Sequence, residues 1–180
     1  MRWVPVLVSV VSLAAFAQEP PFAKKLAPFV ASPNHVVDLM LDMAQVRAGE
    51  TLYDLGSGDG RILIAAAGKY KAKAVGIEIA PKLVKEATAN IAKAGLADQA
   101  KVIQGDLLTA DLSAADIVTI YLATELNADL RPRLEKFLKP GSRVVSHDYA
   151  IPGWKPNKVE KIDGRQGHLV YLYEMPPNKK

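Results

Sequence analysis

Short apolar runs alternate along the chain with longer segments whose apolar residues recur every three or four positions. Each apolar run predicts a buried strand, and these runs lie at about 51–55, 74–79, 101–105, 116–122 and 143–147. The three-to-four spacing predicts helices at about 33–44, 59–69, 81–94 and 125–138. We expect Ser32 to be the N-cap of the first helix, with Pro33 as its first residue.

The order of these elements predicts the fold class. Strands and helices alternate, except that no helical pattern separates the third strand from the fourth. Two further extended stretches, at about 158–163 and 168–174, are joined by a glycine-containing turn and predict a hairpin. We therefore expect an α/β protein of the Rossmann-like, doubly wound kind. Its sheet is expected to be mostly parallel and seven-stranded, with a C-terminal antiparallel hairpin, helices on both faces and one domain over 33–175.

The first residues have the pattern of a targeting segment. Arg2 precedes an almost unbroken apolar stretch from Trp3 to Ala14, and Ala15-Phe16-Ala17 has small residues where a signal peptidase cleaves. We predict a signal peptide over 1–17 and an exported protein, with an uncleaved membrane anchor as the alternative. Residues 18–32 form a Pro-rich N-terminal segment, and we expect no membrane span in the mature chain.

The run from Asp54 to Gly60 is the strongest chemical signal. It places an acidic residue and a tight glycine turn between a strand and a helix, which is typical of a nucleotide-cofactor site. The dinucleotide spacing is absent, since the glycines occupy positions 56, 58 and 60. Asp54 and Asp59 would repel a pyrophosphate but suit a ligand with an ammonium and a sulfonium. We therefore predict S-adenosylmethionine (SAM) as the cofactor, with backbone N–H groups of the turn facing it.

Later strand ends add residues for the rest of the cofactor. Glu78 lies twenty residues after Gly58 and is placed to accept hydrogen bonds from both ribose hydroxyls. Ile79 is expected to pack on the adenine, Asp106 to accept from its exocyclic amine, and Leu107 to cover the ring. The predicted SAM-binding residues from this pattern are Asp54, Gly56, Ser57, Gly58, Glu78, Ile79, Asp106 and Leu107.

The fourth and fifth strands end in residues that face the same edge of the sheet. Tyr121 ends the fourth strand, and we predict that its ring lines the path of the transferred methyl group as the catalytic residue. His147-Asp148 ends the fifth strand, where His147 is either a general base or a structural histidine. His35 and His168 are isolated in sequence, and no metal-ligand spacing is present, so we expect no metal.

Composition excludes several functions. The 180 residues are 49% apolar with a net charge of +4, which suits a globular domain. The absence of cysteine excludes disulfides, thiolate zinc sites and a cysteine nucleophile. No dense basic run with interleaved aromatic residues is present, so we expect no nucleic-acid partner.

The chain resembles a family of small seven-strand, SAM-dependent protein-lysine methyltransferases. The family includes broad-specificity crenarchaeal enzymes and mitochondrial enzymes that act on part of the ATP synthase. The likeness covers about residues 28–174 and includes Val75-Gly76-Ile77-Glu78. Its most specific parts are Pro28-Phe29-Val30-Ala31-Ser32-Pro33, Ser146-His147 and Gly153-Trp154.

The resemblance implies transfer of a methyl group from SAM to the ε-amine of a lysine in a protein substrate. It also implies that the segment before the first helix folds over the cofactor, with Ser32 among the binding residues. Ala31 departs from the family by replacing its usual proline. Two other functions suit the same fold: a small-molecule N- or O-methyltransferase, and a SAM-binding protein without catalysis.

Overall fold

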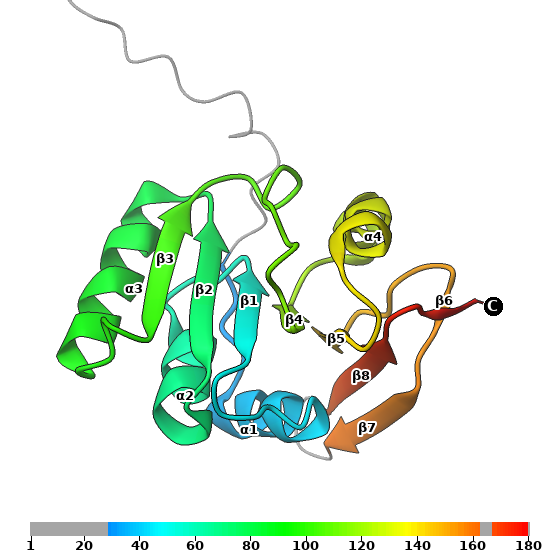
Figure 1. Ribbon diagram of the computed structural model, residues 1–180, viewed down its shortest axis with the longest axis horizontal. Helices are drawn as coiled ribbons and strands as arrows, with labels where there is room; N and C mark the ends of the chain where they lie inside the picture. The colour runs from blue at the N-terminus through cyan, green and yellow to red at the C-terminus, as the bar shows by residue number, and fades with distance from the viewer. Residues whose placement is uncertain (1–28, 163–166, 180) are drawn as a thin grey trace, which may run out of the picture.

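The computed structural model describes residues 29–162 and 167–179 (Figure 1). The predicted signal peptide at 1–17 and almost all of the Pro-rich segment lie outside the described residues, so both stay predictions. Within the described ranges, no helix is long and apolar enough to cross a bilayer.

The main sheet has seven strands in the order β3-β2-β1-β4-β5-β8-β7 (Figure 1). β3, β2, β1, β4 and β5 are mutually parallel, and β8 runs antiparallel to both of its neighbours. This arrangement confirms the predicted fold class, including the C-terminal antiparallel hairpin. The strands are β1 (Thr51–Leu55), β2 (Lys73–Glu78), β3 (Ala100–Gln104), β4 (Ile117–Ile120), β5 (Arg143–His147), β7 (Lys158–Ile162) and β8 (His168–Glu174).

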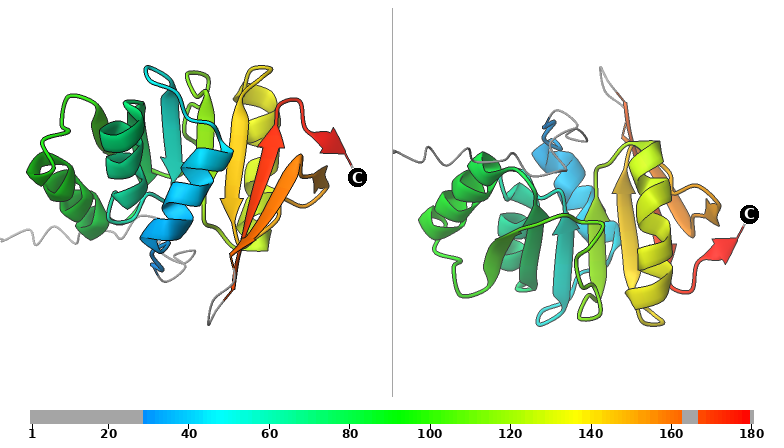
Figure 2. Two further views of the ribbon diagram at one scale, coloured as in Figure 1. Left: turned by 90° about the horizontal axis from the view of Figure 1, so that it is seen from below. Right: turned by 90° about the horizontal axis from the view of Figure 1, so that it is seen from above.

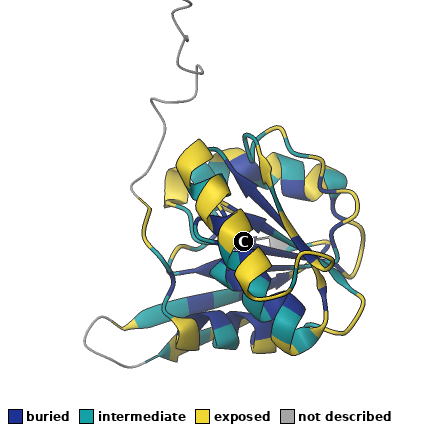
Figure 3. Cartoon of the chain, turned by 90° about the vertical axis from the view of Figure 1, so that its left-hand side faces the viewer, coloured by how far each residue is buried: buried dark blue, intermediate teal, exposed yellow. Residues whose placement is uncertain are grey.

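Helices cover both faces of the sheet, as α1 and α4 on opposite sides show most clearly (Figure 2). One buried apolar cluster joins α1, α2 and α3 to the sheet, and a second joins α4 to the opposite face. Buried residues concentrate in the strands and on the inner sides of the helices (Figure 3). The helices are α1 (Asn34–Met43), α2 (Arg61–Tyr70), α3 (Pro81–Lys93) and α4 (Thr124–Phe137).

A second, two-stranded sheet was not predicted from the sequence. It pairs β6 (Trp154–Lys155) with β9 (Asn178–Lys179), which lies beyond residue 175. The Trp154 side chain is buried, packs edge-on against Tyr173, and donates its Nε1–H to a Glu135 oxygen at 2.9 Å. This contact fixes the chain that follows β5 against α4.

Ser32 does not cap the first helix, so that prediction was wrong. The N-cap of α1 is Pro33, which makes no side-chain capping bond, and the helix begins at Asn34. The Ser32 hydroxyl instead lies 2.8 Å from Nδ1 of His147, at the end of β5. A partner more than a hundred residues away along the chain therefore replaces the local capping bond.

The strand order places the functional edge of the sheet. The chain runs from β1 outward through β2 to β3, and then returns to the other side of β1 with β4. At such a reversal the connections diverge to opposite faces and leave a crevice at the carboxyl ends of the strands. The ends of β1, β2, β3 and β4, where sequence analysis placed its acidic residues and Tyr121, meet at this crevice.

Candidate cofactor-binding site

A cavity of about 320 Å³ opens at the carboxyl ends of β1, β2, β3 and β4. This volume falls within the range of pockets that hold small molecules, roughly 300–1,000 Å³. Nine of the ten residues that the sequence singled out line it: Ser32, Asp54, Gly56, Ser57, Glu78, Ile79, Asp106, Leu107 and Tyr121. The tenth, Gly58, bonds to Glu78 through its backbone.

Glu78 is held by two backbone donors. Its Oε2 accepts the N–H of Gly58 at 2.9 Å, and its Oε1 accepts the N–H of Ala80 at 2.9 Å. Each carboxylate oxygen has a second lone pair, so both can still accept a bond from a ligand hydroxyl. The carboxylate is thus fixed before any ligand arrives, with its burial compensated by these two bonds.

Four backbone N–H groups of the glycine turn are already bonded within the protein, whereas we predicted that such groups would face the cofactor. Gly56 and Ser57 both donate to the carbonyl of Ile77 on β2, at 2.8 and 3.2 Å. Gly58 donates to Glu78, and Gly60 to the carbonyl of Ser57. The turn therefore uses its donors to join β1 to β2, and the polar groups left for a ligand are mainly side chains.

Asp54 is a buried carboxyl at the end of β1. Its Oδ1 accepts the hydroxyl of Thr119 at 2.8 Å. Burial raises its pKa to about 7; the Thr119 bond opposes this, and the negative charges of Glu78 and Asp59 add to it. A cationic ligand group in the cavity would relieve this penalty by favouring the ionised carboxylate.

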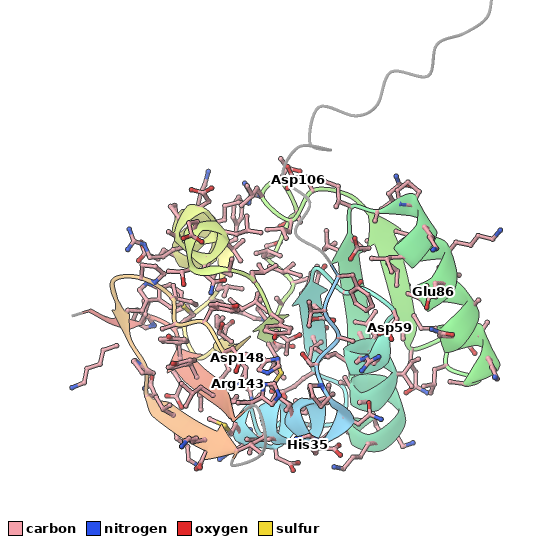
Figure 4. The ribbon with its side chains drawn as sticks, turned by 180° about the vertical axis from the view of Figure 1, so that it is seen from behind. His35, Asp59, Glu86, Asp106, Arg143 and Asp148 are labelled. Carbon is pink, nitrogen blue, oxygen red and sulfur yellow. The ribbon has the colours of Figure 1, made fainter. Side chains whose placement is uncertain are left out.

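Asp59 has a different role from the one predicted, because its charge is already neutralised. The Nε–H and a terminal N–H of Arg61 donate to the Asp59 carboxylate, the latter at 2.6 Å. Asp59 is labelled in Figure 4. Burial opposes ionisation, but the Arg61 hydrogen bonds prevail and hold the pKa of Asp59 below its usual value. Arg61 also donates to the carbonyl of Ser32 at 2.8 Å. The pair therefore ties the segment before α1 to the wall of the cavity.

The remaining walls are largely apolar. Phe29 and Val30 belong to the segment before α1, and the Phe29 ring lies against Gly58. Ile79 and Leu107 line the cavity near Asp106, whose Oδ1 accepts the N–H of Leu108 in the loop after β3 (Figure 4). Asp106 thus acts as a turn cap through one oxygen and keeps its other oxygen for a ligand.

Tyr121 joins the cavity to a group of polar side chains behind it. Its hydroxyl donates to Oδ2 of Asp148 at 3.2 Å, and its ring lies over His147 with centroids 3.9 Å apart. Burial, with the Asp148 charge as a second cause, raises the pKa of Tyr121 to about 12. The hydroxyl therefore stays protonated at neutral pH and acts as a donor.

His147 is a fully buried histidine that does not line the cavity. Burial lowers its pKa to about 4; Asp148 opposes this and His168 adds to it. Of the two roles considered for His147, a neutral and enclosed imidazole fits a structural histidine better than a general base. Its neighbours Asp148 and His168 were not assigned a role from the sequence, although Asp148 follows it directly and His168 begins the next strand of the sheet.

The residues around the cavity fit SAM. The hydroxyl of Ser57 lines the cavity and is buried with no partner among the residues that the structure describes, so a polar ligand atom would satisfy it. Asp54 offers a carboxylate to a cationic group, Glu78 offers two oxygens to the ribose, and Asp106 with Leu107 suits the adenine. These assignments of single residues stay predictions.

Asp54 predicts a pH dependence of cofactor binding. Below pH 7 the free protein carries a protonated Asp54, whereas a bound cation requires the ionised form. The apparent affinity for SAM should weaken as pH falls below about 7, approaching tenfold per pH unit. Calorimetry at pH 6 in buffers of different ionisation heat should show release of a proton on binding. Equal affinity from pH 5.5 to 7 without proton release would exclude this role for Asp54.

Gly58 predicts a second, steric effect. A Cβ at this position would lie 2.1 Å from the Phe29 ring, so Gly58→Ala should push the N-terminal wall outward. We expect the affinity for SAM to fall by about tenfold, or 1.4 kcal/mol. Gly95→Ala is the matched control, because Gly95 also has positive φ but no atom within 4 Å of an added Cβ. If both variants bind SAM like the parent protein, the wall plays no part in binding.

Comparison with known proteins identifies the family. The model of the ANTKMT methyltransferase domain matches residues 54–158, more than half of the chain. A protein-lysine N-methyltransferase of Saccharolobus islandicus is 47% identical over 84% of this chain and 96% of its own. A human lysine N-methyltransferase, named for its action on the ATP synthase, is 34% identical over 87% of this chain and 67% of its own.

A solved structure agrees on the fold and on the cofactor. An RNA methyltransferase from Salinibacter ruber, in complex with S-adenosyl-L-homocysteine, is 48% identical and covers 81% of this chain and 94% of its own, with a TM-score of 0.77. S-Adenosyl-L-homocysteine is what remains of SAM after methyl transfer, so the cofactor predicted from the acidic strand ends is confirmed. The chain belongs to the ANTKMT methyltransferase domain family and is a SAM-dependent methyltransferase.

Proposed function

We propose that the enzyme methylates the ε-amine of a lysine in a protein. Its relatives in Saccharolobus islandicus and human are both described as lysine N-methyltransferases. The Salinibacter ruber relative is described instead as an RNA methyltransferase. Since the relatives differ in substrate, the choice depends on the chemistry of this site.

The charge around the cavity is the observation that carries the proposal. Among the described residues that line it, four carry carboxyl groups and one, Arg61, is basic, and that guanidinium is already paired with Asp59. The acidic residues are Asp54, Asp59, Glu78 and Asp106. Asp54, Glu78 and Asp106 are the groups predicted to hold SAM, so what remains for a substrate is a lining without a free basic group among the described residues. RNA binding depends on free Lys and Arg, which bond its phosphates, so this lining suits an amine better than an RNA.

Aromatic side chains beside the cavity suit a cationic substrate as well. Tyr121 lines it and stacks with Tyr149 at 6.1 Å between ring centroids. Tyr149 is 42% exposed, and Phe29 on the N-terminal wall is 47% exposed. Aromatic faces bind ammonium groups and the aliphatic stem of a lysine. Asn127 holds the carbonyl of Tyr149 at 3.1 Å and so fixes this residue against α4.

Methyl transfer needs a neutral amine. We infer that the surroundings of the amine, rather than a general base, favour its neutral form. SAM supplies the methyl group: the N–C bond forms as the C–S bond breaks, and that electron pair remains on sulfur. Tyr121 cannot remove the proton, because its pKa of about 12 keeps it protonated. Once the amine has entered, the apolar walls and the positive charge of the cofactor disfavour its charged form and lower its pKa, so the proton leaves to solvent. Tyr121, held by Asp148, then orients the amine.

A transfer assay tests the substrate class. Full-length protein is incubated with methyl-labelled SAM and, separately, with a protein extract, an RNA extract and a metabolite extract. We expect protease-sensitive label in the protein fraction, and methyl-lysine in its peptides by mass spectrometry. Label in nuclease-sensitive RNA, or only in metabolites, would contradict the proposal.

The same assay tests Tyr121. Its replacement by Ala should lower kcat by about 10²-fold, because the amine loses its orienting wall. Tyr121→Phe isolates the hydroxyl that donates to Asp148. Tyr70→Phe is the matched control, since the Tyr70 hydroxyl also donates to an aspartate, Asp42, at 2.6 Å. Tyr70 is the last residue of α2, whereas the first residue of this helix lines the cavity. An equal effect of the two Phe variants on kcat would show that the Tyr121 hydroxyl has no specific role.

A further inference from the structure

Three metal-binding atoms converge where β5 ends and β8 begins. His147 is the last residue of β5, and His168 is the first residue of the antiparallel β8. Asp148, labelled in Figure 4, follows His147 directly. Nε2 of His147 lies 3.0 Å from Nδ1 of His168, which lies 3.1 Å from Oδ2 of Asp148. The third side of the triangle, from His147 Nε2 to Asp148 Oδ2, measures 3.3 Å. No sequence spacing indicates this group, because its members come from two strands.

The three sides of this triangle cannot all be ordinary two-centre hydrogen bonds. Each ring nitrogen carries at most one proton, and the carboxylate oxygen carries none. If both nitrogens are protonated, two N–H groups face each other across 3.0 Å. If only one is protonated, the other nitrogen and the carboxylate oxygen face each other with lone pairs. A cation among the three atoms removes the conflict, because all three then direct lone pairs at it.

The dimensions suit a small divalent ion. Zn²⁺ binds histidine nitrogen and carboxylate oxygen at about 2.0–2.2 Å, so two ligands of a tetrahedral site lie roughly 3.3 Å apart. The observed 3.0–3.3 Å is within a few tenths of an ångström of this spacing. Side-chain exposures of 17% for His168 and 25% for Asp148 leave a path for an ion from solvent.

Neighbouring bonds hold the ligands in place. The other ring nitrogen of His147 contacts the Ser32 hydroxyl at 2.8 Å, which orients the ring as the outer partners of metal-binding histidines do. The N–H of Leu169 bonds Oδ1 of Asp148 at 3.0 Å and leaves Oδ2 for the ion. Asp148 also has a φ of +58°, a left-handed conformation that non-glycine residues adopt rarely and that gathers at functional sites.

We propose that His147 Nε2, Asp148 Oδ2 and His168 Nδ1 bind one divalent transition-metal ion. Two imidazoles and a carboxylate are ligands that suit Zn²⁺. The ion would connect β5 and β8. Through Ser32 and Tyr121, which contact His147 and Asp148, it would also connect both strands to the walls of the SAM cavity. This site is separate from the methyl-transfer proposal and does not depend on the identity of the substrate.

Cobalt titration tests the site without an activity measurement. Full-length protein without a histidine tag is stripped of metal with a chelator and titrated with Co²⁺, which reports four-coordinate binding by its visible absorption. We expect one Co²⁺ per chain, displaced by an equivalent of Zn²⁺. His168→Ala and Asp148→Asn should each weaken binding at least tenfold, since even partners of the ligands cost 10–100-fold.

His35→Ala is the control, because His35 is an exposed histidine whose ring lies 6.5 Å from that of His168 (Figure 4). It should bind Co²⁺ like the parent protein. Circular dichroism melts establish whether each variant is folded. If a variant is unfolded, the titration of the parent protein still tests the proposal. Absence of Co²⁺ binding by the parent protein, or affinity equally reduced in His35→Ala, would overturn the proposal. So would unchanged affinity in His168→Ala and Asp148→Asn.

Discussion

The Glu78 carboxylate bonded to two backbone N–H groups is the contact on which the site depends. One of these groups belongs to the turn after β1 and the other to the chain leaving β2. The carboxylate therefore closes the glycine turn and fixes its own position. Charge-assisted bonds of this kind are about twice as strong as neutral ones. The oxygens that would meet a ribose are thus preorganised by the same bonds that shape the turn.

Electrostatics around this contact follow from burial and pairing. Asp59 is neutralised by Arg61, whereas the buried Asp54 has a hydroxyl as its one bonding partner in the described part of the chain and keeps a raised pKa. The cavity therefore has a carboxyl group whose ionisation a cation would favour. This explains in physical terms why the fold suits a positively charged donor better than a dinucleotide.

Local patterns predicted most of the fold. The apolar runs identified the strands of the parallel sheet, and the alternation of strands and helices predicted a mostly parallel sheet with helices on both faces. The twenty-residue interval from Gly58 to Glu78 predicted that both residues belong to one site, and the Gly58 N–H does donate to the Glu78 carboxylate. These features are encoded by residues near each other in sequence, or by strand ends that a parallel sheet must place on one edge.

Competing side-chain partners and the pairing of β5 with β8 were beyond such patterns. Ser32 precedes a proline and a helix, as an N-cap residue does, but its hydroxyl forms a hydrogen bond with His147 on β5. Asp59 has the position of a ligand for the cofactor, but Arg61, two residues away, takes both of its oxygens. His168 approaches His147 only because β8 pairs with β5. In each case a competing partner or a strand pairing decided the outcome, and neither is visible in the sequence.

Calorimetric titration of SAM into the parent protein and into Glu78→Gln tests the central claim most directly. Glu86→Gln, an exposed glutamate on α3, is the control (Figure 4). The account predicts that Glu78→Gln binds SAM ten- to a hundredfold more weakly, as expected for lost bonds to a charged group. It also predicts that Glu86→Gln binds normally and that NAD gives no heat. Unchanged SAM affinity in Glu78→Gln, or uptake of NAD without SAM, would contradict it.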